Sequence, residues 1–219
     1  MKFYLAIVGL VAGLALANGA VSGGSCSVEK GTCTSLFSGF SHVQSDLSKY
    51  TKQMLDKSFH FLLLSKVFDV HDMDRPGFEK LFRKTSDKAW DDTIELIKYQ
   101  AQRGASESRG WEINGVIVHT APALMQHNET SALKMALDYE KLMATEAHHM
   151  HKKISHAENN KQHYDPDVAH FLDEKLIEYQ SQTIRKLAGY ITNLDNIVNE
   201  ANTKELGVKL FDDYLDKAE

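Results

Sequence analysis

Hydrophobic residues recur at the spacing of an α-helix along most of the chain from Ser41 onward, and this periodicity constrains the fold more than any other feature. The first periodic run is interrupted by the segment Asp72–Gly77. A second run begins at Pro76, where the missing N–H of proline costs a helix nothing, and continues to about Arg103, directly before Gly104. The first half of the chain therefore predicts two long helices.

Two more long helices and one short helix are expected in the second half. Asn128 or Thr130 is a candidate N-cap for a third helix over about 130–155. The pair Asp165-Pro166 combines a cap with proline at the first helical position, and it predicts a fourth helix that extends to about Asn199. The sequence TKELGVKLFDDYLDKA predicts a short fifth helix. With the long connection between the second and third helices, this order predicts an all-α fold, a four-helix bundle with one long crossover.

The chain opens with a short apolar segment that has the features of a signal peptide. Lys2 supplies a positive charge, Phe3–Leu16 is mostly apolar, and Ala15-Leu16-Ala17 fits the small-x-small cleavage pattern. We therefore expect cleavage after Ala17, or as late as Ala20, and entry of the chain into the secretory pathway. The alternative is a buried first helix, which the flanking residues and the terminal position disfavour.

Both cysteines of the chain, Cys26 and Cys33, follow this segment. In an oxidising compartment they are expected to form disulfides, and the sequence leaves open whether they close a small loop or link to another chain. Zinc is less favoured, because it needs four ligands and no histidine lies nearby. The expected organisation is a signal peptide over 1–17, a cysteine-bearing extension over 18–40 and the helical bundle with its short last helix over 41–219.

The charge and hydropathy of the chain disfavour a nucleic-acid partner and a membrane-spanning segment after the leader. The net charge of the 219 residues is -5, which does not favour a nucleic-acid partner. No segment after residue 20 has 18 consecutive apolar residues, so no later membrane span is expected. A small secreted carrier or signalling bundle fits the same composition, and only local residue strings distinguish it from other helical bundles.

Several such strings resemble ferritin sequences in their order and spacing. YQAQRGA resembles the end of the second long ferritin helix, DPDVAHFLDE the start of the fourth, and GVKLFDDY the short fifth helix. The resemblance covers about residues 45–215, with a short insertion around SHAENNKQHYD, and the leader and cysteine-bearing extension resemble the secreted ferritins of insects. It implies a ferritin-like bundle that assembles into a cage of twenty-four chains and stores iron as ferric mineral.

The resemblance also implies that this chain is not an enzyme. The ferritin centre that oxidises iron is built from glutamates, a tyrosine and a Glu-x-x-His pair on facing helices. The chain carries other residues at four of these positions and matches the centre at two more: Met54, Phe61, Ala89 and Asp92 are the replacements, and Glu140 and Gln180 are retained. We therefore expect a light-type, non-catalytic subunit that co-assembles with a heavy-type subunit. The two remaining carboxylates are expected to share a proton or to pair with Gln180.

One alternative is a ferroxidase with an atypical site. The segment Glu146-Ala147-His148-His149 contains Glu-x-x-His, but it lies away from the matching position, and we expect it to form a solvated, histidine-rich face. The acceptor triplet Asn128-Glu129-Thr130 is an expected glycosylation site in a secreted chain.

Two further groups match ferritin positions that handle iron outside the catalytic centre. His151, His170 and Asp173 match the lining of the three-fold pores through which iron enters the cage. Asp87, Asp91 and Glu95 follow one face of the second helix and match the patch that seeds the mineral. Lys84 and Lys88 depart from an all-acid patch and leave an ordinary salt-bridged helix face as the alternative.

Overall fold

The structure is a computed structural model that describes residues 26–27, 33–105, 128–155, 164–200 and 203–219. The chain divides into two compact units, Met1–Thr34 and Ser35–Glu219, and every helix of the described residues belongs to the second unit. The described residues contain no β-strand, which confirms the all-α fold class.

The described residues of the second unit form four long helical segments, a one-turn helix before them and a short helix after them. In chain order these are η1 (Phe40–His42), α1 (Gln44–Phe68), α2 (Pro76–Gln102), α4 (Glu129–Ser155), the composite segment α5 (Pro166–Leu172), η4 (Asp173–Ile177) and α6 (Glu178–Asn199), and finally α7 (Lys204–Ala218).

The helix boundaries follow from the local signals in the sequence. Pro76 occupies the first turn of α2, and Gly104 has a φ of 85°, a left-handed conformation that glycine adopts without strain. The N–H groups of Gly104 and Ala105 donate to the carbonyls of Ala101 and Gln100, which is the Schellman arrangement that ends a helix. Asp165 caps α5 by accepting a hydrogen bond of 3.2 Å from the N–H of Val168.

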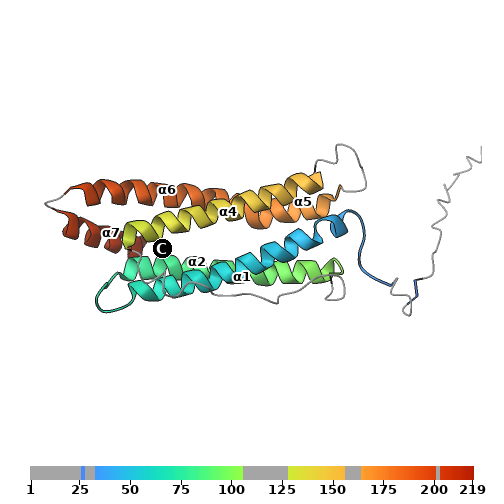
Figure 1. The fold of residues 1–219 in the computed structure, drawn as a ribbon, viewed down its shortest axis with the longest axis horizontal. Coiled ribbons are helices and arrows are strands. Elements are labelled where there is room, and N and C mark those ends of the chain that lie inside the picture. Colours follow the sequence, from blue (N-terminus) through green and yellow to red (C-terminus); the bar gives the residue numbers. More distant parts are fainter. Residues whose placement is uncertain (1–25, 28–32, 106–127, 156–163, 201–202) are drawn as a thin grey trace, which may run out of the picture. The chain divides into compact units, whose positions relative to one another are not determined.

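Two antiparallel helix pairs lie side by side, α1 with α2 and α4 with the α5–α6 segment (Figure 1). Arg75, just before α2, contacts Glu129 at the start of α4, whereas Arg103, at the end of α2, contacts Asp165 just before α5. The helices α2 and α4 therefore run in the same direction, as in an up-down-down-up bundle. The crossover itself falls on residues 106–127, outside the described residues, and its two ends lie at opposite ends of the bundle.

The fourth helix differs from the single continuous helix that its periodicity predicts. Its segment Asp173–Ile177 is π-helical, and it keeps Leu172 and Leu176 buried on one side. A wide π turn inserts about one extra residue into the register, which a helical period read from the sequence does not reveal.

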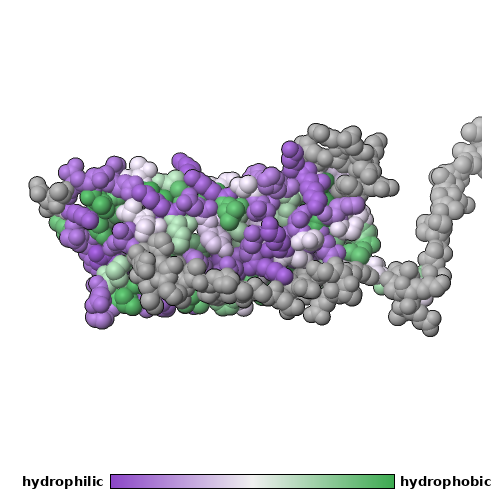
Figure 2. All heavy atoms as spheres, viewed as in Figure 1, coloured by the Kyte–Doolittle hydropathy of each residue, from purple (hydrophilic) through white to green (hydrophobic). Residues whose placement is uncertain are grey.

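The core of the bundle consists of two groups of buried side chains. One group is rich in stacked phenylalanines, such as Phe61 on Phe82 and Phe68 on Phe78, and it includes Phe211 from α7. The other surrounds Met54 and Ala89 toward the opposite end. On the face shown in Figure 2, polar residues prevail and hydrophobic residues are scattered between them. Within the described ranges, no helix combines the length and the apolar character that crossing a membrane requires.

Candidate functional site

The positions that the sequence analysis expects to match the ferritin oxidation centre lie in the middle of the bundle and are closed by packed side chains. Met54 and Phe61 from α1 and Ala89 from α2 are at most 2% exposed and belong to the hydrophobic core. None of these three side chains offers an oxygen or nitrogen ligand. The polar chemistry of the region therefore depends on the remaining residues.

A buried lysine, which the sequence analysis missed, dominates that remaining chemistry. The Nζ atom of Lys57 lies 2.6 Å from Oε1 of Glu140, and the two side chains are 4% and 1% exposed. Lys57 follows Met54 by three residues and precedes Phe61 by four, so the helical period places it on the buried face of α1. That spacing is the sequence signal that could have identified it.

The expectation that Asp92 and Glu140 share a proton or pair with Gln180 is therefore wrong. Glu140 pairs with Lys57 instead. The amide nitrogen of Gln180 donates a buried hydrogen bond of 2.6 Å to the hydroxyl of Tyr50. Oε2 of Glu140 and Oε1 of Gln180 are buried and have no hydrogen-bond partner among the described residues.

Asp92 has its own cation. Lys88, one helical turn earlier on α2, forms an ion pair with the buried Asp92 carboxylate, and its ammonium also lies 4.6 Å from the centroid of the Tyr179 ring. Burial raises the pKa of Asp92 above its usual value, and Lys88 and, more weakly, Lys57 oppose this rise. The two carboxylates at the centre are thus matched by two ammonium groups.

These residues do not fit a pair of iron ions. A di-iron centre needs several anionic oxygens free to bind the metals, and here both carboxylates are engaged by lysines. Across the described part of the chain, no three or more His, Cys, Asp or Glu side chains gather in a way that could hold a metal ion.

In the acidic patch expected on α2, one carboxylate is paired with a cation and, in the described part of the chain, the two nearer the end of the helix are not. Asp87 is paired with Arg83 at 3.1 Å, whereas Asp91 and Glu95 are exposed and have no ion-pair partner within the described residues. In the described residues, Lys84 and Lys88, the two lysines that left a salt-bridged face as the alternative, form no ion pair with Asp87, Asp91 or Glu95. Lys84 contacts Glu219 at 3.2 Å, and Lys88 contacts Asp92.

Two of the three expected pore residues meet where α4 ends and the fourth helical segment begins. Nε2 of His151 lies 3.3 Å from Oδ2 of Asp173. His170, whose side chain is 77% exposed, lies 3.4 Å from Glu174, a carboxylate that the sequence analysis missed. The exposed side of this region therefore carries two histidine–carboxylate pairs.

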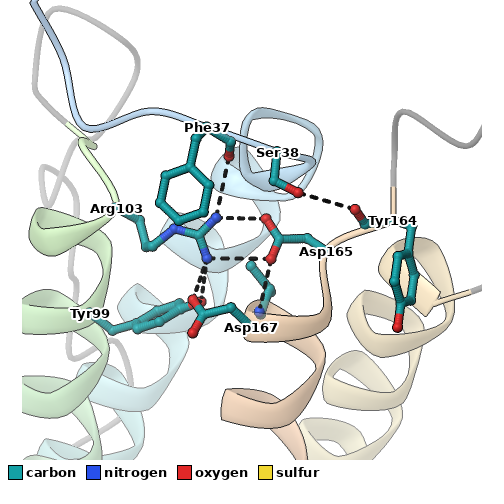
Figure 3. A network of polar contacts seen from close by, with 8 residues as sticks. Phe37, Ser38, Tyr99, Arg103, Tyr164, Asp165 and Asp167 are labelled. Atoms are coloured by element: carbon teal, nitrogen blue, oxygen red, sulfur yellow. Dashed lines mark hydrogen bonds and ion pairs between the residues drawn. The ribbon is translucent and has the colours of Figure 1, made fainter. Parts of the chain in front are cut away.

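A buried arginine holds the helix that carries His170 (Figure 3). The guanidinium of Arg103 donates to both carboxylate oxygens of Asp165, at 2.6 and 3.4 Å, and to the carbonyl of Phe37 at 3.3 Å. It also binds Asp167 and lies 4.2 Å from the centroid of the Phe37 ring. Tyr99 donates to Asp167 at 2.8 Å. The start of α5 is thus tied to the end of α2 and to the segment before α1.

The remaining expected residues lie apart from these groups. Glu146 is half-buried and His148 and His149 are exposed, as expected for a solvated face. Cys26 and Cys33 are joined by a disulfide within the chain, the first of the two pairings that the sequence left open.

Comparisons with known proteins agree with the fold. No family model matches the sequence. The chain is 35% identical over 187 residues to a ferritin light chain of Drosophila melanogaster, covering 84% of this chain and 81% of the relative. It is 34% identical over 180 residues to a ferritin light chain of Trichoplusia ni, covering 80% and 76%. The solved structure of Trichoplusia ni secreted ferritin superposes with a TM-score of 0.73 at 31% identity, covering 87% of this chain and 91% of that chain.

The shared helical bundle and the high coverage support the same family as the residue strings in the sequence. Because the identity exceeds 30% over more than four fifths of its length, the chain belongs to the ferritin family, and it is similar to the light chains of insect ferritins.

Proposed function

We propose that this chain is the non-catalytic, light-type subunit of a secreted ferritin cage that stores, detoxifies and transports iron as ferric mineral. A heavy-type subunit in the same cage oxidises the iron, and this chain supplies shell, pore and seeding surface. The observation that supports the proposal is the buried Lys57–Glu140 ion pair, because Glu140 is one of the residues expected to match the oxidation centre.

The charge of Lys57 argues against ferrous ions at this position. At an effective dielectric constant of about 20, unit charges about 4 Å apart interact with about 4 kcal/mol, and the repulsion of a divalent ion is about twice as large. A ferrous ion beside Glu140 would meet that repulsion and would also have to displace a short ion pair. The buried Met54 and Ala89 provide no oxygen ligand that could compensate for this cost.

Two surfaces support a role in handling iron as cargo. The exposed Asp173, with His151 beside it, is a candidate entry site, because a ring of carboxylates from three subunits would focus negative potential on a pore. Asp91 and Glu95 are exposed and form no ion pair within the described residues, and they remain candidates for seeding the mineral.

Three observations support secretion. The leader sequence has the pattern of a signal peptide. The disulfide between Cys26 and Cys33 is typical of oxidising compartments. The solved structure that the chain resembles is described as a secreted ferritin.

The test compares the chain alone with the chain co-expressed with a heavy-type ferritin subunit. We expect the isolated chain to oxidise ferrous iron little faster than buffer does, and the mixed assembly to oxidise iron and retain it as mineral. Native mass spectrometry should find both chains in one large complex. Oxidation by the isolated chain as fast as by a heavy-type cage would instead identify an atypical ferroxidase, and a persistent monomer would identify a small carrier or signalling bundle.

A further inference from the structure

The acceptor triplet Asn128-Glu129-Thr130 lies where α4 begins. Asn128 immediately precedes the helix and is exposed, and Glu129 and Thr130 form its first turn. The triplet is therefore at the surface, where a bulky oligosaccharide can project into solvent. None of the iron-handling residues discussed above belongs to it.

The side chain of Asn128 also closes the end of the helix. Its Oδ1 accepts a hydrogen bond of 2.9 Å from the N–H of Ser131, while Ser131 Oγ accepts one of 3.0 Å from the N–H of Asn128. Two N–H groups near the helix start are satisfied in this reciprocal way. The amide nitrogen Nδ2 of Asn128 has no hydrogen-bond partner within the described residues.

Capping and glycosylation use different atoms of the same amide. In N-glycosylation, Nδ2 bonds to the anomeric carbon of an oligosaccharide activated as a lipid-linked pyrophosphate. The bond from that carbon to the pyrophosphate oxygen breaks, the lipid pyrophosphate leaves, and Nδ2 loses one proton. Oδ1 remains a carbonyl oxygen and keeps its capacity to accept from Ser131.

The position also keeps a glycan away from the candidate pore. Glu129 pairs with Arg75 at the start of α2, at a distance of 2.9 Å, whereas Arg103 at the end of α2 pairs with Asp165 before the pore helix. The helix α2, which separates Arg75 from Arg103, has 27 residues, and this corresponds to a length of about 40 Å. A glycan on Asn128 would therefore project from the end of the bundle opposite His170 and Asp173.

We propose that Asn128 carries an N-linked glycan and caps α4 with the same side-chain amide. The proposal rests on the secretory part of the proposed function, because the oligosaccharide donor acts in the lumen of the secretory pathway. It adds to that function a modified surface at the end of the bundle where α2 and α4 begin.

The test expresses the full chain in insect cells and analyses the released protein by intact mass and peptide mapping, before and after peptide N-glycosidase F. We expect the leader to be absent, the Asn128 peptide to carry hexose and N-acetylhexosamine, and the enzyme to remove them. Thr130→Ala should abolish the modification with Asn128 in place, and Thr130→Ser should keep it. Released chain without its leader but with an unmodified Asn128 would overturn the glycan alone. Cytosolic chain that retains its leader would overturn the secretory assignment as well.

The capping half of the proposal is tested by thermal unfolding of unglycosylated variants. Asn128→Asp removes the acceptor amide but keeps a capping oxygen, so its melting temperature should match that of Thr130→Ala. Asn128→Ala removes both and should melt at a lower temperature. Equal melting temperatures for all three variants would show that the cap does not use this side chain.

Discussion

Lys57 and Glu140 form a short ion pair in the middle of the bundle, 2.6 Å apart, and both side chains are almost completely buried. They come from α1 and α4, which are connected only through α2 and the crossover. Glu140 is one of the residues that the sequence analysis matched to the ferritin oxidation centre, where a free carboxylate would be needed. A buried pair of this kind is a poor guide to stability by itself, because desolvation of both charges offsets much of their attraction.

Removing one member of this pair should nevertheless destabilise the protein strongly. Lys57→Met leaves Glu140 buried without its cation, and we expect the free energy of unfolding to fall by about 3 to 5 kcal/mol. The double variant Lys57→Met, Glu140→Leu should recover most of the loss, because no buried charge remains. Denaturant unfolding measures both. A matched control is Lys66→Met, which removes an exposed lysine from the same helix and should change stability little.

Restoring the oxidation centre should require removing Lys57. The variant Met54→Glu, Phe61→Tyr, Ala89→Glu, Asp92→His rebuilds the missing ligands around Glu140 and Gln180. We expect little gain in ferrous oxidation from these four changes, because the Lys57 ammonium remains ion-paired with the Glu140 carboxylate. Adding Lys57→Met should produce a clear gain. Stopped-flow oxidation assays on assembled cages compare the two, and equal activity would show that Lys57 does not block the site.

The docking of α7 should depend on Gly77. A Cβ atom at this position would lie 2.0 Å from the backbone oxygen of Asp212 in α7, a contact that only a shift of α7 relative to α2 can relieve. Asp212 also accepts a hydrogen bond of 3.0 Å from the N–H of Phe78. We expect Gly77→Ala to lower the free energy of unfolding by about 1 to 3 kcal/mol.

The control for this change lies in α6. A Cβ at Gly189 meets no atom within 4 Å, so Gly189→Ala should be neutral or stabilise the helix by up to about 1 kcal/mol. Limited proteolysis should release α7 in the first variant only. Equal stability of the two variants would mean that α7 does not need its close approach to α2.

The Arg103–Asp165 contact predicts a loss of stability in acid. Burial would raise the pKa of Asp165, but the hydrogen bonds from Arg103 and from the N–H of Val168 outweigh burial and hold the pKa below the ordinary aspartate value of 3.8. A carboxyl whose pKa is lower in the folded state stabilises the protein above the unfolded-state pKa, and this contribution is lost as the pH falls through the folded-state value.

Unfolding free energies of the parent and Asp165→Asn should therefore differ most near neutral pH and converge below about pH 4. The control Asp167→Asn removes a more exposed partner of the same arginine, and its effect should be smaller at every pH. A gap between the parent and Asp165→Asn that is independent of pH would contradict this reading.

The candidate pore predicts slower iron entry without its acidic residue. In cages that contain this chain, His170→Ala with Asp173→Ala should reduce the rate of ferrous uptake, because the variant loses negative potential and nearby ligands at the entry site. The matched control is Asp213→Ala, which removes an exposed carboxylate from α7. Uptake is followed at equal assembly, and unchanged rates would place the entry route elsewhere.

The sequence alone determined the helices, most of their ends and the class of bundle. Pro76, Gly104, Asn128 and the Asp165-Pro166 pair act within a few residues along the chain, so their effects on helix ends can be recognised without tertiary information. The loss of ligands at Met54 and Ala89 could likewise be read from residue identity, since neither side chain carries an oxygen or nitrogen atom in any fold.

Only the tertiary structure decided which charges meet. Lys57 and Glu140 are 83 residues apart in the sequence, Arg103 and Asp165 are 62 apart, and nothing local selects these partners over the many other charged residues. The same holds for Lys84, whose partner is Glu219, 135 residues later in the chain. Lys88 and Asp92, by contrast, form a local i,i+4 pair within α2. Pairing between helices depends on the register and rotation that packing of the core imposes, and the π-helical segment Asp173–Ile177 shifts the register of its helix by about one residue.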